Sequence, residues 1–272
     1  MIGQDIIARF VALLGTKGVI TDPDDIAPWA SDWRGRYHGT AAAILSPDST
    51  AQVAAAVRLA AELGVALVPQ GGNTSMVGGA TPPADGSALI LSLRRLNRIR
   101  SLSPQDNLAV CEAGVILSVL HDAAEDAGRR FPLRIGAKGS ATIGGLVSTN
   151  AGGTQVLRHG TMRALVEGVE VVLPDGSIFD GLDALKKDNR GYDIKQLLIG
   201  AEGTLGIVTA AALPPRPSTY CRPAAPARRP VRRPARPSPP LPASTQVPGS
   251  PLPHHDSDRA SRWSMVRCRP GR

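Results

Sequence analysis

A glycine-rich stretch at residues 68–82, VPQGGNTSMVGGATP, is the part of the sequence best suited to bind a ligand. Glycine tolerates positive φ angles and lets a ligand approach the backbone closely, and consecutive amides in such a loop can point the same way and bind an anion. We interpret the stretch as a loop around a phosphate or pyrophosphate; the alternative is a glycine-rich surface turn. Its glycines and short polar residues are Gly71, Gly72, Asn73, Thr74, Ser75, Gly78 and Gly79.

Two later segments share this small-residue character. Residues 136–153, GAKGSATIGGLVSTNAGG, consist almost entirely of small residues, and residues 200–208 read GAEGTLGIV. Small residues at this density allow close backbone packing or close ligand approach. Hydroxyl and amide side chains between the glycines supply hydrogen-bonding groups.

Several common site types are missing from the sequence. It has no GxxxxGK[ST] segment, and GAEGTLG is not GxGxxG, so neither a triphosphatase loop nor a Rossmann fingerprint is supported. The cysteines Cys111, Cys221 and Cys268 form no CxxC pair. We expect no metal site, and we interpret His38, His121 and His159 as surface or packing residues.

Patterns of apolar residues and breakers predict the elements that carry the first loop. A helix at 51–63, capped by Ser49 or Thr50 and stopped by Gly64, lies between strands at 41–45 and 65–68. This β–α–β order implies a right-handed crossover and a pair of parallel strands. A helix at 5–14 precedes the unit, and a strand at 88–93 follows it.

The same patterns continue to residue 208. They predict strands at 97–102 and 108–113, a helix at 115–127, a hairpin of 165–173 and 177–179, a short helix at 193–199 and a last strand ending at 208. Trp29, Trp33 and Tyr37, spaced by four, predict one packing stripe in the core.

The composition of the 272 residues divides the chain in two. From residue 214 onward there are 12 Arg, two Asp and no Lys, and this segment holds 15 of the 24 prolines but two of the 29 glycines. The remainder is slightly acidic although the whole chain has a net charge of +8. No run is long and apolar enough for a membrane span, and no secretory signal is recognisable, so we expect a cytoplasmic protein.

Three interpretations of residues 214–272 remain open. A basic arm could bind nucleic acid or an acidic membrane surface, and a proline-rich arm could present extended ligands. The third interpretation, which we favour, is translation out of frame in a GC-rich gene, since such codons give Arg, Pro, Ala and Ser. On that view the chain is truncated.

Three blocks in order, PQGGNTSMVGG, FPLRIGAKGSATIGGLVSTNAGG and KDNRGYDIKQLLIGAEGTLGIVT, resemble the FAD-binding (PCMH-type) domain of the vanillyl-alcohol-oxidase flavoproteins. Among these the sequence is most similar to the D-2-hydroxyacid dehydrogenases, including the glycolate oxidase flavin subunit and D-lactate dehydrogenase. The resemblance covers roughly residues 32–219. It implies an α+β fold of two subdomains, a small parallel β–α–β subdomain and a mainly antiparallel sheet with helices, followed here by a disordered tail.

The resemblance also implies which residues bind the cofactor. The first block would hold the FAD pyrophosphate, the second would line the flavin and ribityl side, and the third would close over the adenosine end. The implied residues are Gln70, Gly71, Gly72, Asn73, Thr74, Ser75, Gly136, Ala137, Ser140, Thr142, Gly144, Gly145, Asn150, Gly152, Glu202, Gly203 and Ile207. Because Asn73 stands where some members carry a flavin-linking histidine, we expect non-covalent FAD.

As a function, the resemblance implies oxidation of a small D-2-hydroxyacid, such as lactate, glycolate or 2-hydroxyglutarate, by hydride transfer to flavin N5. The family's substrate-binding cap has no counterpart here, so catalytic residues stay unassigned and apolar surface should be exposed. One alternative is an FAD-binding remnant without turnover, and a second is a nucleic-acid binder acting through the basic tail.

We therefore expect three parts: an N-terminal helical segment (1–36), the FAD-binding domain (37–213) and the tail (214–272). The expected partners are a hydroxyacid substrate and an electron acceptor that the sequence does not identify. No nucleic acid and no transmembrane segment are expected.

Overall fold

In the computed structural model, which describes residues 2–185 and 187–217, helix α3 (Thr50–Leu63) begins and ends at residues that cap it. The Ser49 hydroxyl accepts a hydrogen bond from the Gln52 amide at 3.3 Å, and Gly64 follows the helix in the left-handed conformation. Both caps agree with the sequence prediction. They fix where the chain enters α3 and where it leaves toward strand β3 (Ala66–Gln70).

The first sheet has the strand order β1-β2-β4-β3, with β1 (Val19–Ile20), β2 (Ile44–Leu45) and β4 (Ala88–Ser92). Strands β2 and β3 are parallel, as the β–α–β pattern predicts, but they are not neighbours: both pair with β4, which lies between them. The reason is burial. Leu89 packs in one hydrophobic cluster and Ile90 in another on the opposite face, so β4 suits the position covered on both sides.

The second sheet is antiparallel, with the order β5-β6-β10-β8-β9. The strands are β5 (Ile99–Ser103), β6 (Leu108–Glu112), β8 (Gly168–Val172), β9 (Ile178–Gly181) and β10 (Ile207–Leu213). The predicted hairpin is β8–β9, but the last strand runs from 207 to 213 rather than ending at 208. Because all of β10 is buried, this strand forms the centre of the sheet.

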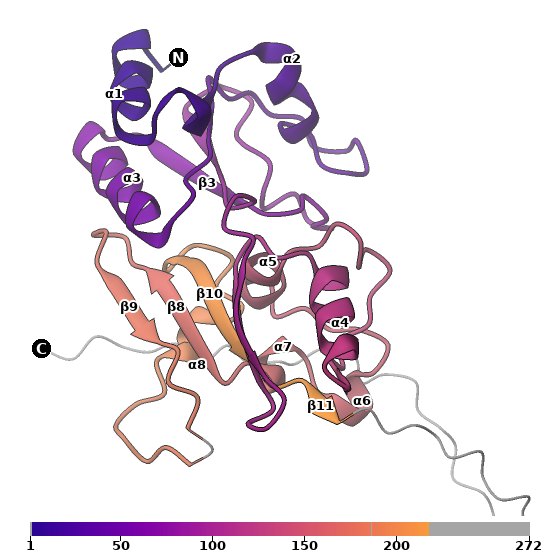
Figure 1. Ribbon diagram of the computed structural model, residues 1–272. Coiled ribbons are helices and arrows are strands. Elements are labelled where there is room, and N and C mark those ends of the chain that lie inside the picture. The colour runs from indigo at the N-terminus through magenta and orange to yellow at the C-terminus, as the bar shows by residue number, and fades with distance from the viewer. Residues whose placement is uncertain (1, 186, 218–272) are drawn as a thin grey trace, which may run out of the picture. The chain divides into compact units, whose positions relative to one another are not determined.

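Helices cover both sheets (Figure 1). Helices α1 (Gln4–Leu14) and α3 pack together over the first sheet, and α5 (Ile143–Ser148) packs against β10. The remaining helices and short strands are α2 (Pro23–Ile26), α4 (Leu117–Asp126), α6 (Val156–His159), α7 (Met162–Leu165), α8 (Lys195–Leu198), β7 (Arg129–Arg130) and β11 (Arg216–Pro217), with 3₁₀ turns at Thr16–Gly18 and Ala27–Trp29.

The fold is therefore α+β, with one largely parallel and one antiparallel sheet, as expected. The expected division at residues 36 and 213 remains a prediction. Helix α1 shares a hydrophobic core with α3, and Arg216–Pro217 at the start of the expected tail form β11 with β7. The rest of the tail lies outside the described residues. Among the described helices, none has the length and apolar character needed to cross a membrane.

The predicted aromatic stripe is wrong for two of its three members. Trp33 is 57% exposed and Tyr37 is 51% exposed. Residues 31–38 form a closed loop rather than a helix, because the buried carboxylate of Asp32 accepts hydrogen bonds from the amides of Arg36 and Tyr37, each at 2.7 Å. The spacing of four residues between the aromatic side chains therefore does not place them on one face of a helix.

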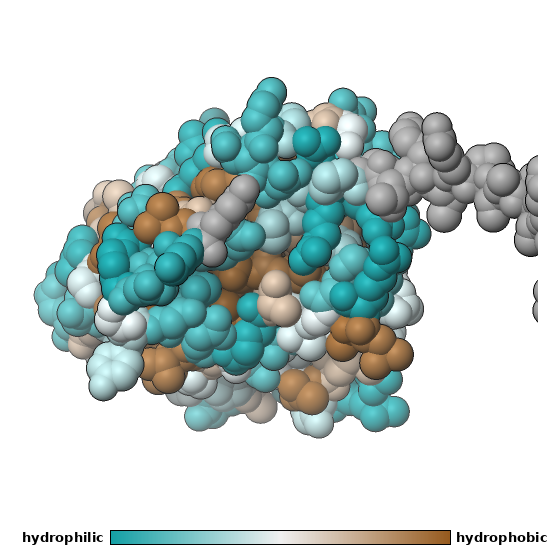
Figure 2. Space-filling view, turned by 90° about the horizontal axis from the view of Figure 1, so that it is seen from below, coloured by the Kyte–Doolittle hydropathy of each residue, from teal (hydrophilic) through white to brown (hydrophobic). Residues whose placement is uncertain are grey.

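Several large apolar side chains are exposed. Figure 2, which views the molecule from below the orientation of Figure 1, shows apolar residues gathered within a mainly polar surface. Exposed apolar patches favour contact with other protein surfaces. The most exposed large apolar residues are Trp33, Met76, Val77, Leu157, Leu185, Tyr192 and Leu197.

Candidate functional site

A cleft of about 520 Å³ brings together three segments that are far apart in the sequence. One wall is the glycine-rich loop that follows β3, and the other is formed by the segment leading into α5 and by α5 itself. The start of β10 and the turn before it close one side. This volume is in the range of small-molecule and cofactor sites in proteins.

The structure brings most of the residues implied by the resemblance to this cleft. Each of the three sequence blocks contributes. The implied residues that line it are Gln70, Gly71, Gly72, Asn73, Thr74, Ser75, Gly136, Ala137, Thr142, Gly144, Gly145, Gly152, Glu202, Gly203 and Ile207.

Ser140 and Asn150 are not among the lining residues. The backbone carbonyl of Ser140 lies against the backbone of Gly72, where the two walls touch. Asn150 has a positive φ of 47°, and its side-chain oxygen accepts a hydrogen bond from the Arg163 amide at 2.9 Å. Both residues therefore shape the segments that form the cleft without facing into it.

Side-chain hydrogen bonds close the glycine-rich loop. The amide nitrogen of Gln70, which is 2% exposed, donates to the carbonyl of Ala80 at 2.8 Å and to that of Trp29 at 2.9 Å. Asn73, in a left-handed conformation, donates from its side chain to the carbonyl of Ser31 at 2.7 Å. The loop is thus held at both ends before any ligand arrives.

Gly71 and Gly72 are required because the two walls touch there. A β-carbon on Gly71 would overlap the hydroxyl of Thr142, and one on Gly72 would overlap the carbonyl of Ser140. Any other residue at either position would force the walls apart. The glycines therefore set the closest approach of the loop to the second segment.

Behind the second wall, α5 packs closely against the antiparallel sheet. A β-carbon on Gly144 would lie 2.6 Å from that of Ala113, and the Gly144 amide donates to the Ala113 carbonyl at 2.8 Å. Both residues line the cleft. The floor of the cleft is therefore built on the end of β6.

The electrostatic character of the cleft comes mainly from backbone amides. Glu202 is the only acidic or basic side chain among the lining residues. Its Oε2 lies 3.3 Å from the position that a β-carbon on Gly79 would occupy. Because no lysine or arginine lines the described cleft, an anion bound there must interact with amide dipoles and hydroxyl groups.

These features fit FAD. The buried hydroxyl of Thr142 lines the cleft and has no hydrogen-bond partner within the described part of the chain. A buried polar atom without a partner is costly, and a ligand group would satisfy it. The small and polar residues that line the cleft leave room for a cofactor and offer it hydrogen bonds.

The sequence analysis did not identify every residue that lines the cleft. Those that it missed follow strands or lie between the small residues of the three blocks. Ala113 and Val208 carry no local signal, because only the packing of β6 against β10 brings them to the cleft. Others stand inside the recognised blocks and could have been included. The missed residues are Pro69, Met76, Val77, Ala80, Leu93, Ala113, Ile135, Ala141, Leu146, Ser148, Thr149, Ala151 and Val208.

The isolated histidines and Cys111 lie away from the cleft lining. His121 forms a hydrogen bond of 2.9 Å with the Leu133 carbonyl, and burial lowers the pKa of its imidazole. Burial also raises the pKa of the Cys111 thiol to about 12. Among residues 2–185 and 187–217, no three His, Cys, Asp or Glu side chains gather in a way suited to a metal ion.

Comparison with known families gives one match that spans more than half of the chain. The sequence model of a family described as FAD binding domain matches residues 41–181. The match includes both walls of the cleft but stops before Glu202.

Two curated relatives are enzymes. The chain is 48% identical over 221 residues to the mitochondrial D-2-hydroxyglutarate dehydrogenase of Bos taurus, covering 80% of this chain and 40% of the relative. It is 43% identical over 213 residues to the probable mitochondrial D-2-hydroxyglutarate dehydrogenase of Oryza sativa subsp. indica, covering 78% and 38%. The chain thus spans about two fifths of the length of these relatives.

A solved structure shows the same fold. Alkyldihydroxyacetonephosphate synthase superposes with a TM-score of 0.71 at 20% identity, over 80% of this chain and 41% of that protein. The expected cytoplasmic location is contradicted, because the bovine and rice relatives are both named as mitochondrial proteins.

Proposed function

The chain belongs to the FAD binding domain family, and on that premise we propose that its cleft binds FAD without a covalent bond. The observation that carries the proposal is the cleft itself, which gathers small and polar residues from three separate segments. Asn73 supports the non-covalent part of the proposal, because its side chain is bonded to the Ser31 carbonyl and offers no nucleophile to the flavin.

The two walls of the cleft would bind different parts of FAD. The amides of Gly71 and Gly72 and the short side chains of Thr74 and Ser75 would hold the pyrophosphate. The hydroxyl of Thr142 would donate to the cofactor from the opposite wall. Glu202, a carboxylate, is suited to accept hydrogen bonds from hydroxyl groups and would repel phosphate, which supports a place at the sugar of the adenosine end.

For the complete protein we propose FAD-dependent oxidation of a small D-2-hydroxyacid. When bound, FAD supplies the hydride acceptor, flavin N5. Support comes from the two relatives, which are named as D-2-hydroxyglutarate dehydrogenases. The residues of this chain would bind and orient the cofactor and exclude water from one side of it; residues that bind the substrate carboxylate and remove the proton remain unassigned.

A second candidate function is FAD binding without turnover. It is favoured by the scarcity of titratable groups in the cleft, where Glu202 is the only acidic or basic side chain among the described lining residues. The third reading, a nucleic-acid binder, depends on the basic tail, which lies outside the described residues.

Absorption spectroscopy on the purified full chain tests cofactor binding. We expect flavin bands, either as purified or after addition of FAD to the cofactor-free protein. Acid precipitation should release all the yellow colour into the supernatant, and colour retained in the pellet would contradict non-covalent binding. A chain that shows no flavin binding under either condition would refute the proposal.

Turnover is a separate measurement. D-lactate, glycolate and D-2-hydroxyglutarate are added to the flavin-loaded chain with and without a dye acceptor. Bleaching of the flavin bands supports the oxidoreductase, whereas stable bands with all three substrates support the binding module without turnover.

A further inference from the structure

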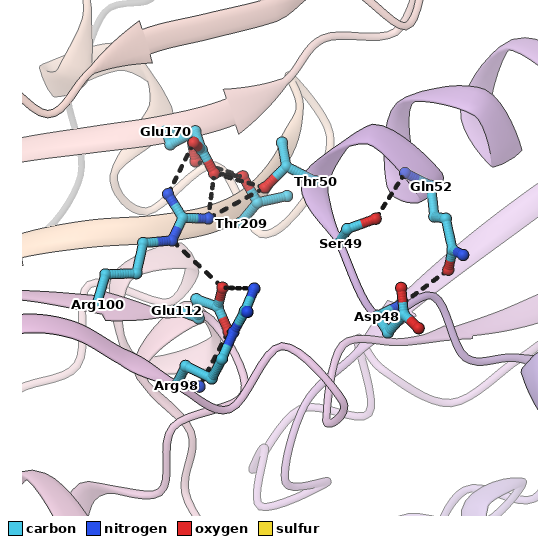
Figure 3. Close-up of polar contacts among 9 residues, drawn as sticks. All are labelled: Asp48, Ser49, Thr50, Gln52, Arg98, Arg100, Glu112, Glu170 and Thr209. Atoms are coloured by element: carbon cyan, nitrogen blue, oxygen red, sulfur yellow. Dashed lines mark hydrogen bonds and ion pairs between the residues drawn. The ribbon is translucent and has the colours of Figure 1, made fainter.

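A connected group of charged and hydroxyl side chains lies on the face of the antiparallel sheet opposite α5. We call it the interlayer network. It consists of Thr50, Arg98, Arg100, Glu112, Glu170 and Thr209 (Figure 3). Five of these residues belong to the antiparallel sheet or the turn before it. Thr50 belongs to α3, which packs over the first sheet; each sheet with its covering helices is called a layer below.

Strand alternation explains how the network forms. In β8, Val169 and Val171 point into the core beneath α5, so Glu170 points to the opposite face. In β6, Cys111 points into the same core, and Glu112 points away from it. The register shift in β10 at residues 208–210 aims the Thr209 hydroxyl at the Glu170 carboxylate, at 2.7 Å.

Glu170 lies at the centre of the network and is 8% exposed. Arg100 binds it with two nitrogens, at 2.9 and 3.0 Å. The hydroxyl of Thr50 donates to its Oε1 at 2.6 Å and lies 3.2 Å from Arg100 Nη2. Thr50 is thus bound to both members of the ion pair.

Glu112 is 1% exposed and completes the charge balance. It accepts hydrogen bonds from Arg98 at 3.0 Å and from Arg100 at 3.3 Å. Two carboxylates therefore face two guanidinium groups. Buried charges are tolerated when they are paired and hydrogen-bonded in this way. Removing one partner leaves a buried charge unpaired, and its desolvation then strongly destabilises the fold.

The strands that carry the network also carry the cleft. Glu112 precedes Ala113 and Thr209 follows Val208, and both Ala113 and Val208 line the cleft. The Ala113 amide donates to the Thr209 carbonyl at 2.8 Å. A shift of these strand ends relative to the other layer would change the shape of the cleft.

The opposite wall depends on α3. Strand β3 follows α3 directly and leads into the glycine-rich loop. At the start of α3, Thr50 joins the network. About two turns further on, Arg58 donates to the carbonyl of Gly176 in the β8–β9 turn at 2.7 Å. Among the hydrogen bonds of the described residues, those of Thr50 alone join α3 to these buried charges.

We propose that the hydrogen bond from Thr50 to Glu170 fixes the separation of the two cleft walls, which makes Thr50 a positioning residue for the cofactor. The proposal rests on the proposed FAD binding. Thr50 and Thr209 donate to the same carboxylate oxygen, but Thr209 does so from within the sheet. Loss of the Thr50 hydroxyl loosens one layer relative to the other, and loss of the Thr209 hydroxyl leaves the layers joined.

This difference provides a matched pair of variants. In the full chain, Thr50→Val and Thr209→Val each remove one hydroxyl while keeping the shape of the side chain. The dissociation constant of FAD is measured by fluorescence titration of the cofactor-free protein well below its unfolding temperature, with thermal unfolding recorded for each variant. We expect Thr50→Val to raise the dissociation constant about tenfold, the equivalent of one hydrogen bond to a charged group.

The controls should separate positioning from stability. Thr50→Ser keeps the donor and should bind FAD within about twofold of the natural chain. Thr209→Val should lower the unfolding temperature and leave FAD affinity within about twofold. Arg98→Gln, at an exposed side chain in the turn before β5, replaces Thr209→Val if that variant does not fold.

Hydrogen exchange measured by mass spectrometry on the cofactor-free chain gives a second readout. Thr50→Val should speed exchange in residues 71–80 and 141–145, and Thr209→Val should not. Equal effects of Thr50→Val and Thr209→Val on FAD affinity and on exchange would overturn the proposal, as would an unchanged Thr50→Val variant. A natural chain that binds no FAD refutes the proposed function instead, and the exchange comparison then decides the positioning role alone.

Discussion

Gly72 lies so close to the backbone carbonyl of Ser140 that a β-carbon on residue 72 would overlap the oxygen. The two residues belong to separate blocks of the sequence and to opposite walls of the cleft. Their contact is backbone to backbone, so neither side can yield as a flexible side chain would. The width of the cleft at this point is therefore set by the absence of a side chain.

We expect Gly72→Ala to abolish measurable FAD binding while the layers stay folded, because their hydrophobic clusters lie away from the loop. The matched control is Gly139→Ala, since a β-carbon on Gly139 meets nothing within 4 Å. Flavin absorbance after gel filtration measures binding, and circular dichroism checks the fold. Normal flavin content in Gly72→Ala would show that the loop can move without loss of the site.

Removal of the Thr142 hydroxyl should have opposite effects on the stability of the cofactor-free chain and on its affinity for FAD. Thr142→Val keeps the size of the side chain and deletes a buried oxygen that has no partner in the described structure. The cofactor-free chain should become more stable by up to about 1 kcal/mol, because an unsatisfied buried group is lost. The affinity for FAD should fall about tenfold if the cofactor satisfies that oxygen. Thermal unfolding and fluorescence titration measure the two effects. Lower stability with unchanged affinity for FAD would mean that the Thr142 hydroxyl stabilises the fold and does not bind the cofactor.

Acid should weaken the interlayer network. Desolvation acts to raise the pKa of Glu170, but the hydrogen bonds from Arg100, Thr50 and Thr209 outweigh it and hold the pKa below its ordinary value of 4.5. The pKa of Glu112 is lowered for the same reason, with Arg98 and Arg100 as donors. A carboxyl with a lowered folded pKa adds stability that is complete above the unfolded pKa and is lost as the pH falls through the folded value.

We therefore expect the free energy of unfolding to decline below about pH 4.5, the region set by the ordinary glutamate pKa. Urea unfolding at a series of pH values measures this decline. Glu170→Gln should be less stable at neutral pH and should show a shallower decline in acid. A decline as steep as that of the natural chain would mean that Glu170 contributes none of it.

Cys111 should resist alkylation in the folded chain. Burial raises the pKa of its thiol to about 12, so almost none is present as the reactive thiolate at pH 8. Iodoacetamide should modify it slowly in buffer and completely in denaturant. Mass spectrometry of the peptide that contains Cys111 distinguishes it from Cys221 and Cys268. Rapid modification without denaturant would place Cys111 in a segment that opens readily.

The sequence by itself determined the local elements and the chemical character of the site. Helix α3 could be placed to within one residue because Ser49 and Gly64 act on their immediate neighbours. The glycine-rich loop could be recognised because glycine has the same conformational freedom in any context. The three ordered blocks were enough to identify the FAD-binding domain.

Only the tertiary structure decided which segments meet. Nothing near Ala113 or Val208 in the sequence indicates that they line the cleft, and nothing near Thr50 indicates that it binds a glutamate 120 residues away. The same holds for β4, whose place between β2 and β3 follows from burial on both faces. Caps and turns depend on interactions within a few residues, whereas pairing of strands and contact between layers depend on the burial of surfaces that the whole chain provides together.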